Sequence, residues 1–248
     1  MQKTIIDITD LSRDFVLGAE VVRALRGVSL TIKEGEFVSI MGTSGSGKST
    51  LLNILGCLDQ ASAGSYKIDG VVVKNLNRNA LAKIRNEKIG FIFQSYNLLA
   101  RTTAIENVEL PLMYNPQSNS VQRKQRAIDA LNLVGLADRL KHTPNQLSGG
   151  QQQRVAIARA LVNDPVVILA DEATGNLDTR TSYEILALFQ KLNKEGKTII
   201  FVTHEPDIAT FTQRTIVLKD GRIIKDQIND QVANAQKALD LLPKEVDA

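Results

Sequence analysis

One stretch constrains the fold more than any other, Gly42-Thr43-Ser44-Gly45-Ser46-Gly47-Lys48-Ser49-Thr50, because it has the form G-x-x-x-x-G-K-[ST]. An apolar run at residues 36–41 precedes it and predicts a buried strand, and residues 51–55 predict a helix after it. The glycines allow backbone conformations in which successive N–H groups point at a polyphosphate, and the helix N-terminus adds partial positive charge. Strand, loop and helix together predict a nucleotide-binding site.

The polar side chains of this loop have distinct expected contacts. Lys48 is expected to reach the β- and γ-phosphates of ATP, and the Ser49 hydroxyl is expected to bind Mg²⁺. The residues of the loop predicted to bind the nucleotide are Gly42, Ser44, Gly45, Ser46, Gly47, Lys48, Ser49 and Thr50. The alternatives are a glycine-rich turn before a core helix, and a dinucleotide site, which is weaker because Thr50 replaces the third glycine of that motif.

Composition narrows the class of protein. The 248 residues, 43% of them hydrophobic, suit one domain or one core with an inserted lobe. The chain shows no run of eighteen uncharged apolar residues and no signal-peptide pattern, so we expect a soluble intracellular protein. A net charge of +3 with scattered basic residues does not indicate a nucleic-acid surface. The single cysteine, Cys57, excludes an internal disulfide and a cysteine-based zinc site, and we expect it in the core.

Strands alternate with helices along most of the chain, which predicts a mostly parallel sheet. We expect strands at residues 4–8, 28–32, 65–73, 89–93, 165–170, 198–203, 215–218 and 222–225. Ligands of such sheets bind beyond the carboxyl ends of the strands. Gln94, Asp171, Glu172 and His204 all stand at predicted strand ends and are therefore candidate site residues.

Residues 95–162 differ from the rest, because helical periodicity dominates in residues 104–113, 121–133 and 148–161 without a strong strand. We interpret this stretch as a helical subdomain inserted into a single domain of residues 1–248. From about Ile228 the chain is expected to form a charged helix and a frayed tail to residue 248, without chemistry of its own.

Asp171 and Glu172 close an apolar strand downstream of the phosphate loop. Enzymes with such a loop keep a carboxylate there that holds Mg²⁺ through a water, the role expected for Asp171. Glu172 can reach past the metal and orient or deprotonate the attacking water. Without the loop, the pair would be interpreted as a strand that simply ends in polar residues.

A second anion site is predicted at Leu147-Ser148-Gly149-Gly150-Gln151, where Ser148 is a good N-cap and the glycines leave the first helical N–H groups uncovered. The motif alone could be only a capped helix. If it serves the same nucleotide as Lys48, a second subunit is expected to complete each pocket. Phe15, placed in the first connection, is a candidate for stacking on adenine.

These motifs together resemble the nucleotide-binding subunit of ATP-binding cassette (ABC) transporters, from about Thr4 to Ile224. The resemblance implies a P-loop NTPase core of the α/β class, with a mostly parallel sheet, an antiparallel β portion and an inserted helical subdomain. The corresponding motifs are Walker A (Gly42 to Thr50), the Q-loop (Gln94), the signature (Leu147 to Gln151), Walker B (Val167 to Asp171), the catalytic glutamate (Glu172), the D-loop (Asn176-Leu177-Asp178) and the switch histidine (His204).

The resemblance also implies a mechanism. Two cassettes close head to tail, so that ATP lies between Walker A of one subunit and the signature residues Ser148, Gly149, Gly150 and Gln151 of the other. Gln94 is expected to contact Mg²⁺ and to report the nucleotide state to a membrane permease, and His204 is expected to contact the γ-phosphate. Phe15 corresponds to an aromatic position where the family usually has tyrosine. The permease would hold the subunit at the inner face of the cell membrane.

Finer motifs at residues 54–59, 106–112 and 174–178 resemble the branch that powers lipoprotein release, macrolide or antimicrobial-peptide export, and septal cell-wall regulation. That branch implies mechanical export of a lipoprotein, macrolide or peptide-like cargo. One alternative is a cell-division type ATPase that signals through a permease to periplasmic cell-wall enzymes. A soluble cassette ATPase acting on DNA or ribosomes is disfavoured, because those relatives carry paired cassettes, zinc-binding cysteines or coiled-coil insertions.

Overall fold

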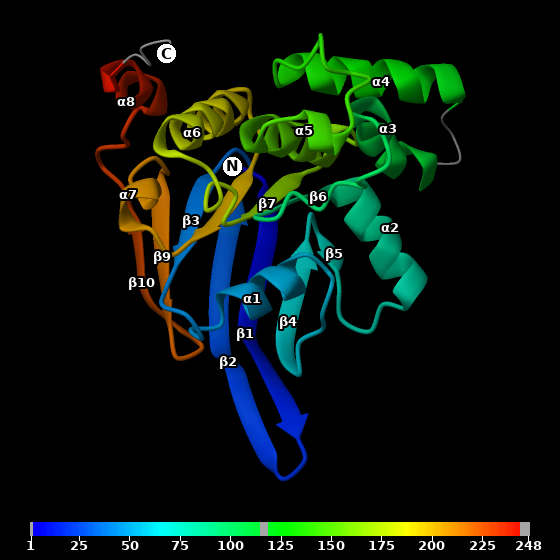
Figure 1. Ribbon diagram of the computed structural model, residues 1–248. Coiled ribbons are helices and arrows are strands. Elements are labelled where there is room, and N and C mark those ends of the chain that lie inside the picture. Colours follow the sequence, from blue (N-terminus) through cyan, green and yellow to red (C-terminus); the bar gives the residue numbers. More distant parts are fainter. Residues whose placement is uncertain (1, 115–118, 244–248) are drawn as a thin grey trace.

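The computed structural model describes residues 2–114 and 119–243, which form two β-sheets with helices around them (Figure 1). The smaller sheet is antiparallel, in the order β2-β1-β4-β5, and the larger has the order β10-β9-β3-β8-β7-β6. Its strands from β9 to β6 are parallel, and β10 is an antiparallel edge. This architecture confirms the predicted fold class. The strands are β1 (Thr4–Leu17), β2 (Glu20–Lys33), β3 (Phe37–Met41), β4 (Ala63–Ile68), β5 (Val71–Val72), β6 (Ile89–Phe93), β7 (Val167–Asp171), β8 (Ile199–Thr203), β9 (Arg214–Lys219) and β10 (Arg222–Ile228).

The central strands are covered on both faces. Side chains of a strand alternate between the two faces of a sheet, and in β7 Ile168 packs into one apolar cluster while Val167 and Leu169 pack into another. The first cluster lies under the helices, and the second lies between the two sheets and around α1 (Lys48–Leu55). A strand that is buried on both faces has a continuous run of apolar residues, and this is why the sequence pattern predicts these strands.

The helices gather mainly on one side. Figure 1 shows α3, α4 and α5 together, far from the tip of the β1–β2 hairpin, which projects from the body. The described residues of the stretch 95–162 contain helices and 3-10 turns but no strand. The remaining helices are α2 (Arg78–Lys88), α3 (Ala104–Glu109), α4 (Ser120–Leu133), α5 (Gly149–Leu161), α6 (Thr179–Lys194), α7 (Pro206–Ala209) and α8 (Ala235–Leu241), with 3-10 turns at Leu110–Tyr114 and Pro144–Gln146.

Several sequence-based boundaries are wrong. The strands expected at residues 4–8 and 28–32 are parts of two 14-residue strands, so Phe15 lies within β1 and not in a connection. The stretch 65–73 is two strands, with a turn at Asp69 and Gly70. The helix expected at residues 104–113 becomes 3-10 after Glu109, since Pro111 provides no N–H.

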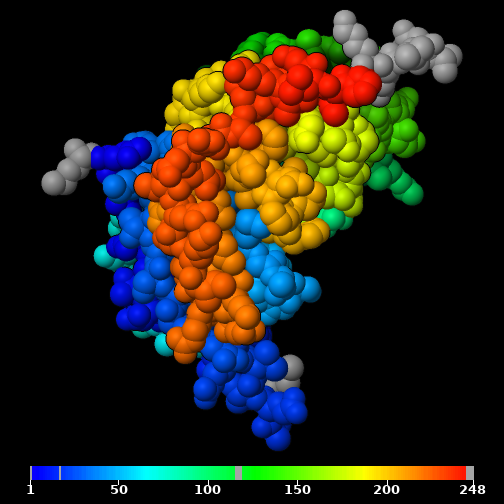
Figure 2. All heavy atoms as spheres, turned by 90° about the vertical axis from the view of Figure 1, so that its left-hand side faces the viewer, coloured from blue at the N-terminus to red at the C-terminus, as the bar shows by residue number. Residues whose placement is uncertain are grey.

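The C-terminal part also differs from the prediction. Strand β10 continues to Ile228, and the only helix in the described part of the chain after it is the seven-residue α8. Figure 2 shows β10 and α8 as a band along one face of the molecule. The Gln190 side chain ties this segment to α6, because it donates to the carbonyl of Ala233 at 2.7 Å and accepts from the amide of Ala235 at 2.9 Å. The predicted tail at residues 244–248 lies outside the described residues.

The register of the parallel strands aligns their carboxyl ends. Met41 pairs with Thr203, Asp171 pairs with Val202, and Phe93 pairs with Asp171. The residues that follow these strands, among them Gly42 and His204, therefore emerge at one edge of the sheet, as the sequence pattern predicted.

Candidate nucleotide-binding site

The phosphate loop turns at glycines that no other residue could replace without movement. Gly47 has φ +104°, and a Cβ there would lie 2.6 Å from the carbonyl oxygen of Ala24. A Cβ on Gly42 would lie 2.4 Å from the carbonyl oxygen of Leu218. Gly47 is also the N-cap of α1, and because it has no side chain the first amides of the helix stay available to an anion.

Lys48 is the first residue of α1 and is held inside the loop. Its ammonium donates to the carbonyl oxygens of Gly42 at 2.7 Å and Thr43 at 2.9 Å, and the residue is only 8% exposed. The loop therefore holds a buried cation against its own carbonyl oxygens. Ser46, within the loop, is buried and does not line the cleft, and its carbonyl accepts from the amide of Gly221 at 3.0 Å.

A cleft of 1470 Å³ opens above the loop and brings most of the predicted residues together. The predicted site residues that line it are Gly42, Ser44, Gly45, Gly47, Lys48, Ser49, Thr50, Gln94, Asp171, Glu172 and His204. Two arginines of β2, Arg23 and Arg26, form part of its wall, as do Lys219 and Asp220 of the β9–β10 turn. These four residues belong to none of the motifs, so the sequence analysis did not predict them.

Asp171 and Glu172 place two carboxylates in the cleft. Burial and the neighbouring charge of Glu172 raise the pKa of Asp171, and the ammonium of Lys48 opposes that rise. Glu172 has φ +45°, a left-handed conformation that is uncommon for a residue with a side chain. Its Oε1 lies 2.8 Å from Nδ1 of His204, at the end of the neighbouring strand.

The donor set at the cleft fits Mg²⁺. Ser49, Gln94 and Asp171 supply hydroxyl, amide and carboxylate oxygens, the ligands that a hard cation prefers. A cation there would offset both causes of the raised pKa of Asp171, its burial and the charge of Glu172. Within residues 2–114 and 119–243 no three His, Cys, Asp or Glu side chains form a metal cluster.

Asn176 orients the amide of Gln94. The Nε2 of Gln94 donates to Oδ1 of Asn176 at 3.3 Å, and Nδ2 of Asn176 donates to the carbonyl of Gln94 at 3.1 Å. With its Nε2 engaged, Gln94 has its Oε1 left to accept a ligand. The partnership joins positions distant in the sequence, so the motifs alone did not predict it.

The signature residues do not line this cleft. Ser148 caps α5, its Oγ accepting from the amide of Gln151 at 3.3 Å, while Oε1 of Gln151 accepts from the amide of Ser148 at 3.0 Å. A Cβ on Gly150 would lie 2.4 Å from Cγ2 of Thr181, so the signature turn packs against the start of α6. Asp178 caps α6, and hydrogen bonds from Thr181 lower the pKa of Asp178. Ser148, Gly149, Gly150, Gln151 and Asp178 therefore form a separate surface.

Phe15 lies beside the cleft and does not line it. Its neighbour in the register is Val22, which does line the cleft. The guanidinium of Arg13 lies 4.4 Å from the centroid of the Phe15 ring, and its Nε donates to Asp59 at 2.9 Å. One face of the ring is thus already covered by a held cation.

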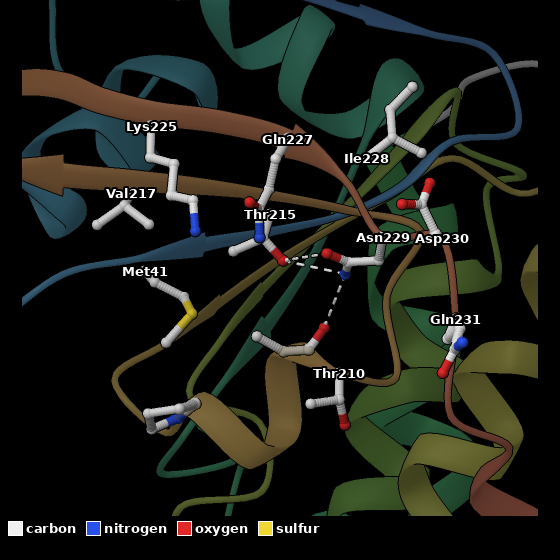
Figure 3. Close-up of a pocket in the computed structure, with 12 residues that line it drawn as sticks. Met41, Thr210, Thr215, Val217, Lys225, Gln227, Ile228, Asn229, Asp230 and Gln231 are labelled. Atoms are coloured by element: carbon white, nitrogen blue, oxygen red, sulfur yellow. Dashed lines mark hydrogen bonds between the residues drawn. The ribbon is translucent and has the colours of Figure 1, made fainter.

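A second depression, of 470 Å³, lies between α7, β9 and β10 (Figure 3). It shares Met41 and Val217 with the cleft, but none of the predicted site residues lines it. Its central amide, Asn229, donates to the carbonyls of Ala209 and Thr212 and to the hydroxyl of Thr215, and so supports the fold. The cleft above the phosphate loop is therefore the candidate site.

Comparison with known sequences shows which proteins the chain is similar to. Residues 25–175 match the sequence model of a family described as ABC transporter. The chain is 52% identical over 225 residues to an uncharacterized ABC transporter ATP-binding protein, YvrO, of Bacillus subtilis, covering 91% of this chain and 98% of that relative. It is 54% identical over 223 residues to the macrolide export ATP-binding/permease protein MacB of Chlorobium phaeobacteroides, covering 90% of this chain but 34% of MacB.

A solved structure has the same fold. The ATP-binding cassette MJ0796 of Methanocaldococcus jannaschii, in a dimeric post-hydrolysis state bound to ADP and Pi, superposes with a TM-score of 0.83 at 48% sequence identity. The match covers 90% of this chain and 98% of that one. In residues 2–114 and 119–243, no helix is both long and apolar enough to cross a membrane.

Proposed function

Because the chain belongs to the ABC transporter family, we propose that it forms a head-to-tail homodimer that closes on ATP and drives a separate membrane permease. The chain itself is an ABC ATPase, the ATP-binding subunit of a transporter, related to the macrolide exporter MacB and to MJ0796. The proposal concerns how this subunit works, and what it drives.

One observation carries the proposal. The cleft contains Lys48, Asp171, Glu172 and His204, whereas Ser148 begins a helix whose signature turn faces elsewhere. A phosphate-binding helix start that its own cleft does not use is accounted for by a second subunit. The dimeric MJ0796 structures support this arrangement, since their fold and length match the present chain.

The roles of the cleft residues follow from their chemistry. Lys48 and the loop amides bind the β- and γ-phosphates, and Phe15 flanks the adenine through the β2 side of the cleft. Ser49, Gln94 and Asp171 would hold Mg²⁺, which when bound would neutralise charge on the phosphates. Glu172 takes the proton of the attacking water, and His204 orients Glu172 through the 2.8 Å contact.

The permease is a separate chain in this proposal. MacB carries its permease in the same polypeptide, and the present chain covers only 34% of that length. A partner corresponding to the remainder would hold the subunit at the inner face of the membrane. The macrolide-export relatives support mechanical export or extrusion of a macrolide, lipoprotein or peptide-like cargo, in preference to cell-division signalling.

The variant Glu172→Gln tests the dimer and the chemistry together. Glutamine keeps the shape but removes the base, so turnover should fall by about 10²–10⁴ while ATP affinity is spared. Closure depends on ATP and opening on hydrolysis, so the variant should accumulate as an ATP-bound dimer in size-exclusion chromatography. Hydrolysis at the wild-type rate would remove Glu172 from the proposed role, and a slow but monomeric variant would contradict the closed-dimer account.

The membrane partner is tested by co-expression. A permease encoded in the adjacent reading frame should co-purify with the ATPase in detergent, and its vesicles should stimulate phosphate release by the ATPase. Vesicles with an unrelated permease are the control. Equal stimulation by both kinds of vesicle would contradict a dedicated partner.

A further inference from the structure

A buried glutamine outside the predicted site contacts the catalytic turn. Gln153 lies on α5 and is completely buried. Its Nε2 donates to the carbonyl oxygen of Ala173 at 2.6 Å, and Ala173 directly follows Glu172. The hydrogen bond is short and excluded from water, so it restrains the backbone more firmly than an exposed amide contact would.

The turn that Gln153 contacts has an unusual backbone. Glu172 has φ +45°, and residues with side chains keep such a conformation only where the surroundings hold it. The amide of Glu172 donates to the carbonyl of Val202 at 2.9 Å, and its carbonyl accepts from the amide of Gly175 at 2.9 Å. These bonds fix Glu172 itself, whereas the next peptide carbonyl, that of Ala173, is fixed by the Gln153 side chain.

We propose that Gln153 is a positioning residue for Glu172, holding the turn after β7 so that the Glu172 carboxylate points into the cleft. The inference rests on the proposed role of Glu172 as the base. Gln153 does not contact the nucleotide site, since it is absent from the lining of the cleft, and it acts only through the backbone.

Gln153 lies on the same helix, α5, as the signature residue Ser148. Ser148 caps the same helix at its start, and in the proposed dimer this start contacts the ATP of the other subunit. One rigid helix therefore bonds at its first turns both to the partner's nucleotide and to the catalytic turn of its own subunit. A displacement of α5 when ATP binds across the interface is transmitted to Ala173 through the Gln153 side chain.

The test compares two neighbouring glutamines of α5. Gln153→Met keeps the length of the side chain and removes the donor to Ala173. Gln152→Met is the matched control, because the Gln152 side chain donates to the carbonyl of Leu147 at 3.1 Å and not to the catalytic turn. We expect Gln153→Met to lower kcat at least tenfold, with KM for ATP within twofold of wild type. Gln152→Met should retain the wild-type kcat.

A double-mutant cycle shows whether Gln153 acts through Glu172. In a Glu172→Gln background, Gln153→Met should cause no further loss in single-turnover hydrolysis, because the base it positions is already absent. A further loss equal to that in wild type would overturn the proposal. The proposal for Gln153 would also be overturned if Gln153→Met had the wild-type kcat while Glu172→Gln was inactive. That result would leave the proposed role of Glu172 intact. Wild-type hydrolysis by Glu172→Gln would overturn the role of Glu172 itself.

A second variant keeps the test decisive if methionine destabilises the fold. Gln153→Glu has the same shape, but its carboxylate presents an oxygen to the Ala173 carbonyl, and only the protonated form donates a hydrogen bond. The ratio of wild-type kcat to variant kcat should therefore fall toward one as the pH is lowered. A constant ratio across the range in which both proteins stay folded would overturn the proposal.

Discussion

The Nδ1 of His204 lies 2.8 Å from Oε1 of Glu172, joining the residue after β8 to the residue after β7. A carboxylate accepts hydrogen bonds only, so Nδ1 carries the proton in this contact and, in the neutral ring, Nε2 is the nitrogen that can accept one. The pair therefore orients the carboxylate that we assign to the attacking water. It also leaves a second imidazole nitrogen for a phosphate oxygen.

Removal of this partner should slow hydrolysis more than it weakens binding. His204→Ala is expected to lower kcat about 10²-fold, as for a lost orienting group, with ATP affinity nearly unchanged. Phosphate release and titration with a fluorescent ATP analogue measure the two effects. The chain has 2 histidines, and His142→Ala, on the helical side, is the matched control. A fall in affinity as large as the fall in kcat would contradict the assignment.

Lys48→Ala should weaken ATP binding sharply and leave the fold intact. The buried ammonium donates to two loop carbonyls, and its loss should cost about 2–5 kcal/mol of ATP binding, as for other charge-assisted contacts. Titration with a fluorescent ATP analogue measures it, and Lys33→Ala on the exposed end of β2 is the control. Unchanged affinity would remove Lys48 from the site.

Asp171→Asn should stabilise the nucleotide-free protein while impairing activity. The folded-state pKa of Asp171 is raised by burial and by Glu172, so the native protein binds this proton more tightly than the unfolded chain does. Its charge therefore costs stability above the unfolded value of 3.8, increasingly as the pH rises through the folded pKa.

Asp171→Asn is therefore expected to unfold at a higher temperature than wild type at neutral pH, because the amide carries no charge to bury. Thermal melts at pH 7 and at progressively lower pH measure it. The difference from wild type should shrink as the pH approaches 3.8. A variant less stable than wild type at pH 7 would show that the carboxylate supports the fold instead.

The sequence predicted the parts of the fold that follow from local chemistry. Strands such as β7 are continuous apolar runs because both faces are buried, and the polar residues after them meet because the strands are parallel. The length of the β1–β2 hairpin was underestimated. Its outer half exposes Val16, Val21 and Val22, so apolar and polar residues do not alternate there as in a half-buried strand. The short α8 depends on tertiary bonds to Gln190, which composition cannot reveal.

The candidate site was predictable in its motif residues and not in their partners. Lys48, Asp171 and His204 belong to patterns in which the residue type itself carries the chemistry. Gln153 belongs to no motif, and Asn176 stands in the D-loop pattern without a predicted contact. The fold alone places these two amides against Gln94 and Ala173. Pairings of this kind between distant positions have no local signature.

Ser148 distinguishes the composite site from a site within one subunit. Its Oγ caps α5 by accepting from the amide of Gln151, and aspartate is an equally good cap, so Ser148→Asp should keep the helix while adding a negative charge. In the proposed dimer that charge faces the triphosphate held by the other subunit. Repulsion there should abolish ATP-dependent dimerisation and leave ATP binding by the monomer nearly as before.

Light scattering of the Ser148→Asp protein with and without ATP measures dimerisation. Titration with a fluorescent ATP analogue at low protein concentration measures the affinity of the monomer for ATP. Ser148→Asn is the matched control, because asparagine caps a helix as well as aspartate does but carries no charge. It should dimerise far better than the aspartate variant, so the difference between the two measures the charge alone. If Ser148→Asp loses monomer binding and dimerisation to the same degree, Ser148 serves the nucleotide of its own subunit. In that case the signature turn cannot be the half-site that a second chain completes.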